Sequence, residues 1–547
     1  MNKDNKVSSG MQEAPMNLAS ILEHAARFHG NQEIVSRLAS GEVHRYTYRE
    51  ALARSKQLAN ALKAYGIEFG DRIATMAWNG YRHFESWYGI AGQGAICHTV
   101  NPRLFPAQIR FIINHAGDRI VFVDPAFVGL LEEIQDELPT VEMFVVLSSN
   151  AEFSATTLRA AIDYESFIGD QSDDFDWVEL DEAAPSSLCY TSGTTGDPKG
   201  VLYSHRSNLL MAYASSSADA FKLSALSTVL MVVPMFHANS WGLVYSAPMS
   251  GAKLVLPGPN LDGASIYDLV NSEKVTFSAA VPTVWSMLLD YMTTNQLQVP
   301  ALEEVVIGGS ALPRSMLVRF KRDFGVDVLQ AWGMTEVSPL GSINRPMPAT
   351  LKLDGDAQLA VALKQGRPLF GLQMCIKDEN GLELPFDGKT PGRLMVRGPW
   401  VVSSYYKNDS VILDSDGWFD TADIATIDAE GFMQITDRAK DIIKSGGEWI
   451  SSVDLENAAM NHPEVALAAV IGVPHPKWEE RPLLLVKLNP GAALLEPALK
   501  EFLIGEVAKW WIPEDIKFVA DIPLTATGKI NKMALRDDHV ADYKVHN

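Results

Sequence analysis

The sequence predicts an α/β protein, with a large N-terminal domain of two parallel α/β sheets plus a small antiparallel β unit, followed by a mobile α+β C-terminal domain. Short Val-, Ile- and Leu-rich runs alternate with helical-period segments through the first 345 or so residues, as in parallel sheets covered on both faces. From about residue 350, turns rich in Gly, Pro and Asp separate short alternating strands. A chain of 547 residues is longer than one hydrophobic core usually supports, so two or more domains are expected.

The predicted elements follow the chain in a regular order. In the N-terminal part the patterns predict helices near 81–92 and 106–116 and strands at 73–79, 95–100, 120–124, 229–235, 253–257, 276–282 and 304–309. Near the C-terminus they predict a helix near 452–461, apolar strands at 465–474 and 481–488, and a helix near 497–509. A boundary near 437–441 therefore divides the chain into domains 1–437 and 442–547, joined by 438–441.

Composition excludes several classes of partner. The formal net charge of −21 argues against nucleic acid, so an anionic ligand must be drawn by local cations and backbone N–H groups. The sequence has no apolar run of about eighteen residues, and the N-terminus lacks a secretory pattern, so we expect a cytoplasmic protein without a membrane span. The scattered Cys97, Cys189 and Cys375 fit buried structural thiols in a reducing compartment.

The stretch 190–200, YTSGTTGDPKG, concentrates glycines, hydroxyl side chains and one lysine in a single segment. It fails the P-loop pattern, because Asp197 and Pro198 separate Gly196 from Lys199 and Gly200 follows the lysine. Glycines let backbone N–H groups converge on one concavity, and the lysine adds a point charge suited to phosphate oxygens. A coincidental surface turn is the alternative interpretation of this segment taken alone.

Five further segments occur in order with this loop: GGSALP at 308–313, QAWGMTE at 330–336, GWFDTAD at 417–423, DRAKDIIKSGGEWI at 437–450 and PLTATGKINK at 523–532. Together the six motifs resemble the ANL superfamily of adenylate-forming enzymes, which contains acyl-CoA synthetases, peptide-synthetase adenylation domains and luciferases. The resemblance runs from about residue 18 to 540. Within the superfamily the chain looks most like a bacterial acyl-CoA ligase for short or medium acids.

The resemblance implies a reaction in two halves, with ATP and CoA as substrates and Mg²⁺ as cofactor. A small carboxylic acid attacks the α-phosphorus of ATP, and the CoA thiol then attacks the acyl carbon and releases AMP. Such a ligase needs no enzyme cysteine as nucleophile. A homodimer is expected from the general frequency of such assemblies.

The resemblance also implies which residues bind ATP. The loop would surround the β- and γ-phosphates through Thr191, Ser192, Gly193, Thr194, Thr195 and Lys199. The adenine slot would be lined by Ser310, Ala311, Pro313, Gln330, Ala331, Trp332, Gly333 and Met334. Asp423 would accept hydrogen bonds from the ribose hydroxyls with help from Arg438, and Ile435 would pack on the purine.

Glu336 and Lys529 are the predicted catalytic centre. A carboxylate beside a triphosphate needs a cation between them, so Glu336 would hold Mg²⁺ while Thr335 contacts the α-phosphate. Lys529 would bridge the acid and the α-phosphate and offset their repulsion. Lys532, three residues later, is expected to be a surface residue or a minor phosphate contact.

The thioester half uses other residues. Lys440 matches the hinge position of the superfamily, and a swing of the C-terminal domain would withdraw Lys529. It would bring forward Gly446 and Gly447, which suit a narrow pantetheine tunnel, flanked by Lys444, Glu448 and Trp449.

The acid would lie beside His237 and Trp241, with Gly308, Gly309, Gly333, Met334, Pro339 and Trp449 around it. His237 stands where amino-acid-activating relatives carry an Asp, which disfavours an α-amino acid. It could be a general base, although a gate or wall role is favoured. Trp241 should shorten the pocket, and Trp and Met are compatible with a thioether acid.

Other functions stay open at this point. A P-loop kinase or ATPase would produce ADP, and the failed motif counts against it. A module that loads a carrier protein would be expected to have a fused carrier domain. A luciferase-like oxygenase shares all six motifs, and light emission with a luciferin would distinguish it.

Overall fold

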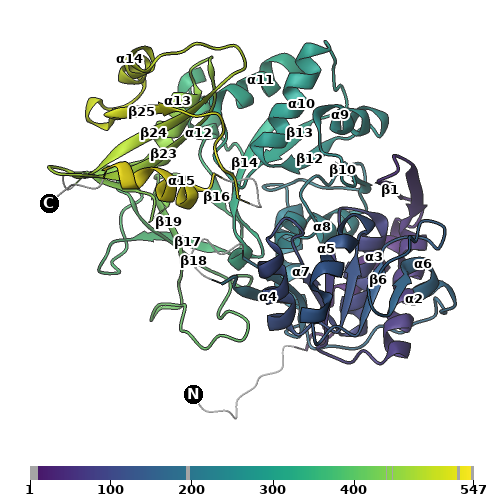
Figure 1. Ribbon diagram of the computed structural model, residues 1–547. Helices are drawn as coiled ribbons and strands as arrows, with labels where there is room; N and C mark the ends of the chain where they lie inside the picture. The colour runs from purple at the N-terminus through teal and green to yellow at the C-terminus, as the bar shows by residue number, and fades with distance from the viewer. Residues whose placement is uncertain (1–9, 192–196, 439, 446–447, 526–529, 544–547) are drawn as a thin grey trace.

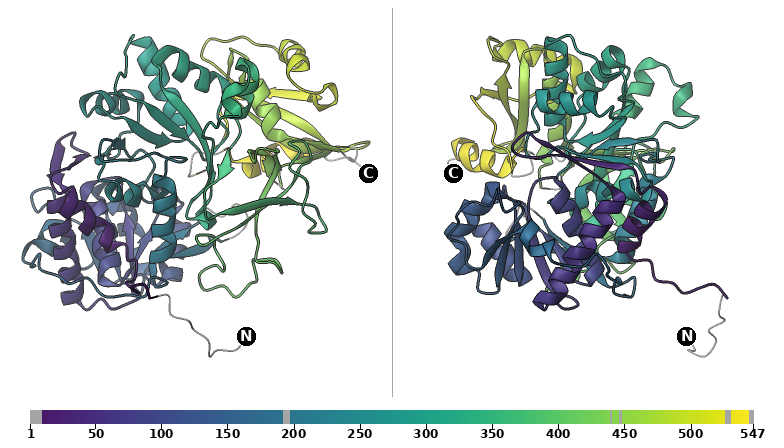
Figure 2. Two further views of the ribbon diagram at one scale, coloured as in Figure 1. Left: turned by 180° about the vertical axis from the view of Figure 1, so that it is seen from behind. Right: turned by 90° about the vertical axis from the view of Figure 1, so that its right-hand side faces the viewer.

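The computed structural model describes residues 10–191, 197–438, 440–445, 448–525 and 530–543, with the side chains of 448, 449, 541 and 542 excepted. The described residues form four sheets, and Figures 1 and 2 show the C-terminal residues in yellow beside the teal and green parts of the molecule. The α/β fold class is confirmed, with two mixed, mostly parallel sheets, an antiparallel four-stranded sheet and a small α+β unit at the C-terminus.

The first sheet has seven strands, parallel except for the last pair. Its order is β7 (Ala161–Asp163), β6 (Met143–Val146), β5 (Ile120–Val123), β3 (Arg72–Met76), β4 (Ile96–Thr99), β8 (Pro185–Tyr190) and β9 (Gly200–Ser204). The surrounding helices are α2 (Tyr48–Tyr65), α3 (Tyr81–Gln93), α4 (Pro106–Ala116), α5 (Val128–Ile134), α6 (Tyr164–Gly169) and α7 (His205–Ser216). The strands predicted at 73–79, 95–100 and 120–124 are confirmed here, as are both helices between them.

Local sequence signals explain where these helices begin and end. Thr47 and Glu50 form a capping box, in which each side chain satisfies the other's backbone N–H at the start of α2. Pro106 occupies the first turn of α4, where no N–H is needed. Gly66, which ends α2, and Gly117, which ends α4, have φ of 91° and 74°, a conformation that suits glycine.

The second sheet has nine strands, and its central strands are parallel. Its order is β16 (Arg367–Pro368), β15 (Leu340–Ile343), β14 (Asp327–Gly333), β13 (Glu304–Ile307), β12 (Phe277–Ala280), β10 (Thr228–Leu230), β11 (Lys253–Leu256), β1 (Glu33–Arg37) and β2 (Val43–Thr47). Its helices are α1 (Ala19–Phe28), α8 (Leu243–Met249), α9 (Gly263–Ser272), α10 (Pro282–Thr294), α11 (Arg314–Phe324) and α12 (Gly355–Ala362).

The strand predicted at 229–235 is shorter than expected, because β10 ends at Leu230. The side chain of Asn79 takes the place of a neighbouring strand. Its amide donates to the carbonyls of Met231 and Val233 at 2.6 and 2.8 Å, and its Oδ1 accepts from the Met235 N–H at 2.7 Å. A side chain therefore satisfies these two carbonyls and this N–H, which would otherwise need a strand partner, although the Met231 N–H still donates to the Val255 carbonyl of β11 at 2.9 Å.

The antiparallel unit predicted after residue 350 is present as the four-stranded sheet β17 (Gln373–Lys377), β18 (Gly392–Arg397), β19 (Phe419–Ile427) and β20 (Met433–Arg438). The C-terminal unit pairs β22 (Glu448–Ile450), β21 (Ile443–Ser445), β24 (Glu479–Leu488) and β23 (Val465–His475), with β25 (Asp515–Phe518) beside β24. It is completed by α13 (Ser452–Met460), α14 (Glu496–Glu506) and α15 (Lys532–His539).

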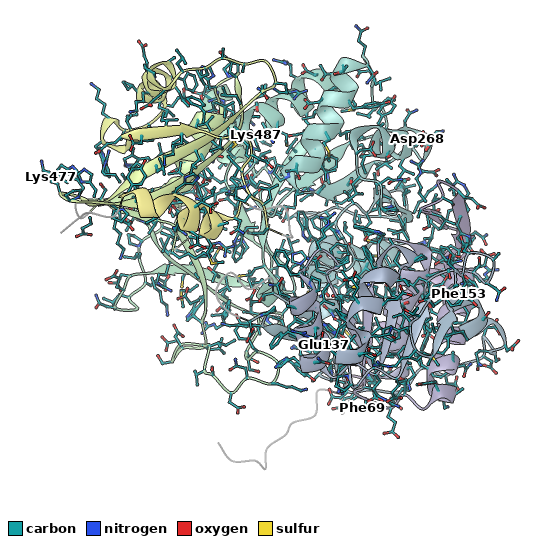
Figure 3. The ribbon with its side chains drawn as sticks, viewed as in Figure 1. Phe69, Glu137, Phe153, Asp268, Lys477 and Lys487 are labelled. Carbon is teal, nitrogen blue, oxygen red and sulfur yellow. The ribbon has the colours of Figure 1, made fainter. Side chains whose placement is uncertain are left out.

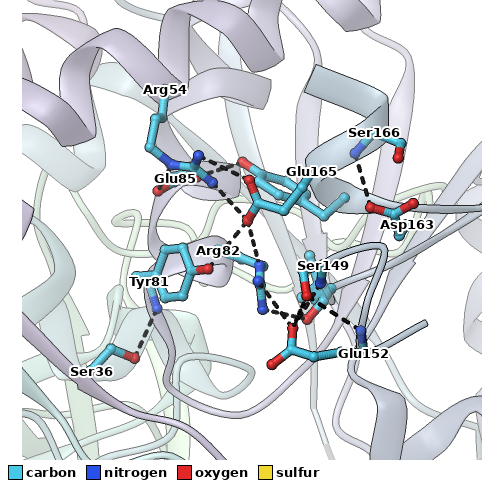
Figure 4. Close-up of polar contacts among 12 residues, drawn as sticks. Ser36, Arg54, Tyr81, Arg82, Glu85, Ser149, Glu152, Asp163, Glu165 and Ser166 are labelled. Atoms are coloured by element: carbon cyan, nitrogen blue, oxygen red, sulfur yellow. Dashed lines mark hydrogen bonds and ion pairs between the residues drawn. The ribbon is translucent and has the colours of Figure 1, made fainter. Parts of the chain in front are cut away.

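An ion-pair network joins three helices at the edge of the first sheet (Figure 4). Arg54 of α2 contacts Glu85 of α3 at 2.8 Å and Glu165 of α6 at 3.0 Å, and Arg82 contacts Glu165 at 2.8 Å. The Tyr164 hydroxyl donates to the second oxygen of Glu85 at 2.8 Å. Glu85 is fully buried, so these partners replace the water that its carboxylate loses on folding.

All three cysteines are buried and free, as the sequence predicts. Burial raises the pKa of the Cys189 thiol, which keeps it protonated and unreactive. In the described part of the chain, no helix is long and apolar enough to cross a bilayer.

Candidate functional site

A cavity of about 450 Å³ opens at the carboxyl ends of the central strands of the nine-stranded sheet. Residues one or two positions beyond β10, β12, β13 and β14 line it, namely Val232, Val281, Gly308 and Met334. Ligands of α/β sheets bind at this edge, because the loops that follow the strands converge there.

Many of the predicted site residues meet in this cavity. Those that line it are Thr191, Lys199, His237, Trp241, Gly308, Gly309, Ala331, Trp332, Gly333, Met334, Thr335, Glu336, Pro339 and Arg438. Segments from four motifs distant in the sequence therefore lie around one space. The predicted residues Ser310, Ala311, Pro313, Gln330, Asp423 and Ile435 are not among its lining residues.

Thr191 follows β8 and Lys199 precedes β9, and these two strands form an antiparallel pair. Tyr190 pairs with Gly200 at the end of the ladder. Beyond it the Thr191 N–H donates to the Lys199 carbonyl at 2.9 Å, and the Lys199 N–H donates to Thr191 Oγ1 at 3.3 Å. The predicted Ser192, Gly193, Thr194 and Thr195 lie outside the described residues. Both ends of the loop are thus held together at the cavity, with Lys199 on its wall.

Glu336 lies in a short 3-10 turn, Thr335–Val337, directly after β14. Its side chain is 8% exposed, and its Oε1 accepts a hydrogen bond from the Tyr405 hydroxyl at 2.9 Å. Burial raises the pKa of Glu336, against the opposing effects of this hydrogen bond and of Arg438 and Lys199. The Tyr203 hydroxyl donates to the Thr335 carbonyl at 2.7 Å and fixes the same turn.

A buried carboxylate that faces a cavity suits a hard divalent cation, which would offset the cost of its burial. Within the described ranges, no group of three or more His, Cys, Asp or Glu side chains is arranged to hold a metal ion. The donor set therefore fits a cation held by one carboxylate together with ligand oxygens and water. It does not fit a cation enclosed by protein ligands alone.

Asp423 of β19 is held from two sides. The Trp332 indole N–H donates to Asp423 Oδ2 at 2.9 Å, and the Arg438 guanidinium lies 2.9 Å from Oδ1. Asp423 and Arg438 face each other across the β19–β20 ladder. Asp423 is 3% exposed, so its orientation is fixed before any ligand arrives.

Gln330 holds the GGSALP segment in place. Its Oε1 accepts from the Leu312 N–H at 3.3 Å, and its side chain is 1% exposed. The structure thus places Gln330 behind the segment that contains Ser310 and Ala311. Its contact with that segment is one that the motif alone did not reveal.

The wall opposite the β14 loop has an unusual backbone. Ala238, Asn239, Ser240 and Trp241 all have φ between 43° and 52°, followed by Gly242 at 82°. A left-handed run of this length costs non-glycine residues free energy, and such strain is typical of functional sites. It carries the Trp241 ring against Gly308, where an added Cβ would lie 2.9 Å from the ring. His237 precedes this run and also lines the cavity.

Of the residues predicted for the thioester half, the described Lys440 and Lys444 are not among the residues that line the cavity. The cavity lining formed by described residues ends, in sequence order, at Arg438. Lys444 is exposed in β21 and faces Trp449 of β22 in the ladder, with Glu448 at the start of that strand. Gly446, Gly447 and the predicted catalytic Lys529 lie outside the described residues. Lys440 is exposed two residues after Arg438.

The expectation that Lys532 is a surface residue was wrong, and its alternative role as a minor phosphate contact stays a prediction. Its side chain is 11% exposed, and its ammonium lies 2.8 Å from Glu456 and donates to Ser452 Oγ at 2.5 Å. The lysine joins α15 to α13 inside the C-terminal unit, because Glu456, which is 7% exposed, requires a cation. The spacing of PLTATGKINK gave no signal for this pairing.

Sequence reasoning also missed Tyr203, Tyr405 and Arg103. The two tyrosines support the Glu336 turn, and Arg103 lines the cavity with its guanidinium over the Trp78 ring at 5.6 Å. None belongs to the six motifs. Tyrosines and arginines are spread through the whole chain, so only their proximity to the cavity reveals them.

Comparison with protein families assigns most of the chain. Residues 22–406 match the family model described as AMP-binding enzyme. Residues 454–529 match the model described as AMP-binding enzyme C-terminal domain. The first model covers the two large sheets and every cavity-lining residue named here except Arg438.

Known proteins resemble the chain over nearly its full length. The 3-methylmercaptopropionyl-CoA ligase of Ruegeria lacuscaerulensis is 48% identical over 528 residues, which is 96% of this chain and 98% of the relative. The medium-chain-fatty-acid–CoA ligase of Ectopseudomonas oleovorans is 48% identical over 522 residues, which is 95% of this chain and 96% of the relative.

A solved structure agrees with the fold. The anthranilate CoA ligase AuaEII in complex with anthranoyl-AMP superposes with a TM-score of 0.86 at 26% identity, and the match covers 96% of this chain and 99% of that one.

Proposed function

This chain belongs to the AMP-binding enzyme family and is an AMP-forming acid–CoA ligase, and from this premise we propose that its acid is a short- or medium-chain carboxylate, with 3-methylmercaptopropionate as the specific candidate. The observation that carries the proposal is the cavity beside Trp241. Trp241 and apolar groups line its acid side, and Lys199, Glu336 and Arg438 line its phosphate side. The names of relatives at 46–48% identity support the same two classes of acid.

The apolar side of the cavity favours a small acid with a polarisable end. The Trp241 ring occupies the space that the glycine at 308 leaves open, and Met287 and Met334 are further lining residues. Thioether sulfur makes favourable contacts with aromatic rings, so a methylthio group suits this wall. A cavity of about 450 Å³ is small for a site shared by an acid and a nucleotide, given the roughly 300–1,000 Å³ of ligand pockets.

A medium-chain fatty acid is the second candidate. Met287 lines the cavity and is also 43% exposed, so the acid side reaches the surface at α10. A chain longer than the cavity could extend past this residue into solvent. A luciferase-like or carrier-loading activity is less favoured.

In the first half-reaction a carboxylate oxygen attacks the α-phosphorus, and the bond to the bridging oxygen breaks as pyrophosphate leaves. Lys199 would bind the leaving phosphates, and Thr335 would contact the α-phosphate. Glu336 would hold Mg²⁺, which neutralises phosphate charge when bound. Asp423, fixed by Trp332 and Arg438, would accept hydrogen bonds from both ribose hydroxyls.

Lys529 would bridge the attacking carboxylate and the α-phosphate, where a cation offsets like charges. For the second half, the domain 442–547 would rotate about the hinge 438–441 at Lys440. The CoA thiol then attacks the acyl carbon, AMP leaves with the bonding electrons, and the thiol proton passes to solvent. Lys444, Gly446, Gly447, Glu448 and Trp449 would border the pantetheine path.

The test is a panel of C2–C10 acids and 3-methylmercaptopropionate with ATP and Mg²⁺, with and without CoA. We expect CoA-dependent AMP formation, and kcat/KM highest for the methylthio acid. Highest kcat/KM for a C6–C10 acid would favour the second candidate. ADP as product, or light emission with a luciferin, would contradict the proposal. Static light scattering tests the expected homodimer.

A further inference from the structure

Tyr405 lies between the two charged groups at the phosphate side of the cavity. Its hydroxyl donates to Glu336 Oε1 at 2.9 Å. The Lys199 ammonium lies 5.0 Å from the centroid of its ring. One side chain therefore contacts both a carboxylate and an ammonium that come from different sheets, and it lines the cavity itself.

The backbone around Tyr405 is hydrogen-bonded to the two segments that carry Glu336 and Lys199. The Val402 N–H donates to the Glu336 carbonyl at 2.8 Å, and the Ser338 hydroxyl donates to the Trp400 carbonyl at 2.8 Å. On the other side, the Tyr406 N–H donates to the Gly200 carbonyl at 2.8 Å, at the base of the lysine loop. The segment 400–406 thus links the Glu336 turn to the β8–β9 hairpin.

Side chains reinforce this link. Val402 and Tyr405 pack against a small apolar cluster of Cys189, Val201 and Tyr203. The Tyr406 hydroxyl donates to the Ala116 carbonyl at 3.3 Å, and the Lys407 ammonium donates to the His115 carbonyl at 2.7 Å, both at the end of α4. These packing contacts and hydrogen bonds therefore fix the position of the Tyr405 ring.

We propose that Tyr405 is a positioning residue that fixes the spacing between the Glu336 carboxylate and the Lys199 ammonium, so that divalent cation and polyphosphate are bound as one unit. The proposal rests on the proposed function, in which Glu336 holds the cation and Lys199 the phosphates. The hydrogen bond to Oε1 fixes the orientation of the Glu336 carboxylate at the cavity. The ring adds a cation–π contact that restrains a long, flexible lysine.

The two contacts can be separated by substitution. Tyr405→Phe removes the hydrogen bond to Glu336 and keeps the ring below Lys199. Tyr405→Leu removes both contacts. Tyr406→Phe is the matched control, because it deletes the neighbouring hydroxyl, whose partner is a carbonyl of α4 rather than a group in the cavity.

The direct readout is Mn²⁺ binding, measured by electron paramagnetic resonance in the presence of a non-hydrolysable ATP analogue. We expect Tyr405→Phe to weaken Mn²⁺ binding 3- to 10-fold and to raise the KM for ATP by a similar factor, with the KM for the acid changed less than twofold. We expect the inhibition constant of pyrophosphate to be 2- to 5-fold higher for Tyr405→Leu than for Tyr405→Phe. Tyr406→Phe should stay within twofold of the unmodified enzyme in every measurement.

Unchanged Mn²⁺ binding in Tyr405→Phe, with normal thermal unfolding, would overturn the inference. Equal losses in Tyr405→Phe and Tyr406→Phe would also overturn it, because they would indicate a general effect on the segment. Glu336→Gln separates the inference from its premise. If Glu336→Gln binds Mn²⁺ normally, the assignment of Glu336 as the cation ligand is wrong. If Glu336→Gln loses Mn²⁺ binding but Tyr405→Phe binds normally, Glu336 remains the cation ligand and the positioning role of Tyr405 is wrong.

Discussion

The indole N–H of Trp332 donates to the carboxylate of Asp423 over 2.9 Å, although the two residues are 91 positions apart in the chain. Both side chains are buried, and Arg438 holds the second carboxylate oxygen. A carboxylate fixed in this way is pre-oriented, so a ligand that it binds loses less free energy to ordering.

Trp332→Phe should therefore weaken ATP binding while it preserves most of the aromatic surface. Loss of one hydrogen bond to a charged group corresponds to about 1.5–3 kcal/mol, so we expect the KM for ATP to rise at least tenfold and the KM for the acid to stay within twofold. Trp285→Phe is the control, because that buried indole donates to the Val306 carbonyl in the core. A comparable rise in the KM for ATP in both variants would argue against a role for Trp332 at the nucleotide.

Gly308→Ala should change acid recognition rather than nucleotide binding. The new Cβ would lie 2.9 Å from the Trp241 ring and 3.1 Å from the Ala331 carbonyl, so the ring must shift. We expect the KM for the acid to rise about tenfold, as for a perturbation of roughly 1–2 kcal/mol. Gly129→Ala in α5, where an added Cβ meets nothing within 4 Å, is the control. An unchanged acid preference in Gly308→Ala would contradict the assignment of Trp241 to the wall that contacts the acid.

Lys532→Met should destabilise the C-terminal unit strongly. It leaves the buried Glu456 without its cation, which costs about 3–5 kcal/mol in comparable buried pairs. The matched control is Lys487→Met, at a residue labelled in Figure 3. The Lys487–Asp521 pair has the same 2.8 Å separation, but its side chains are 40% and 79% exposed. There we expect less than about 1 kcal/mol. Calorimetric unfolding of both variants checks the difference, and equal effects would contradict the buried pairing.

Stability should fall as the pH is lowered from about 6.5 toward 4, in part because of His83. Burial lowers the pKa of His83 to about 4, while its unfolded value is about 6.5. Within that window the unfolded state binds a proton that the folded state does not, so the free energy of unfolding decreases by up to about 1.4 kcal/mol per pH unit. Thermal midpoints at pH 7 and 5 measure this effect. His83→Gln should flatten the dependence, whereas the same change at the exposed His24 should leave it intact.

Lys529→Ala should block formation of the acyl-adenylate by at least a hundredfold, since one preorganised charge commonly contributes that much. Thioester formation from supplied acyl-adenylate should be preserved, because the lysine would be withdrawn in that half. Gly447→Leu should show the reverse pattern. Pyrophosphate release and CoA-thioester formation, followed separately, test both variants. Equal loss of the two half-reactions in Lys529→Ala would refute alternation of the domains.

Much of this architecture could be predicted from the sequence because the signals are local. Apolar runs and helical periodicity predicted strands and helices to within a few residues, and the order of the six motifs predicted the family. The exception at 229–235 is instructive, because the side chain of Asn79 replaced a strand partner that the pattern implied.

The sequence by itself determined the fold class, the reaction type and the residues that carry the motifs, since each depends on residue types at short, fixed spacings. Only the tertiary structure decided which side chains support them. Tyr405 reaches Glu336 across 69 positions and Lys532 reaches Ser452 across 80. Such pairings depend on how distant segments pack, and a buried charge takes its partner from whichever segment folding brings within hydrogen-bonding distance.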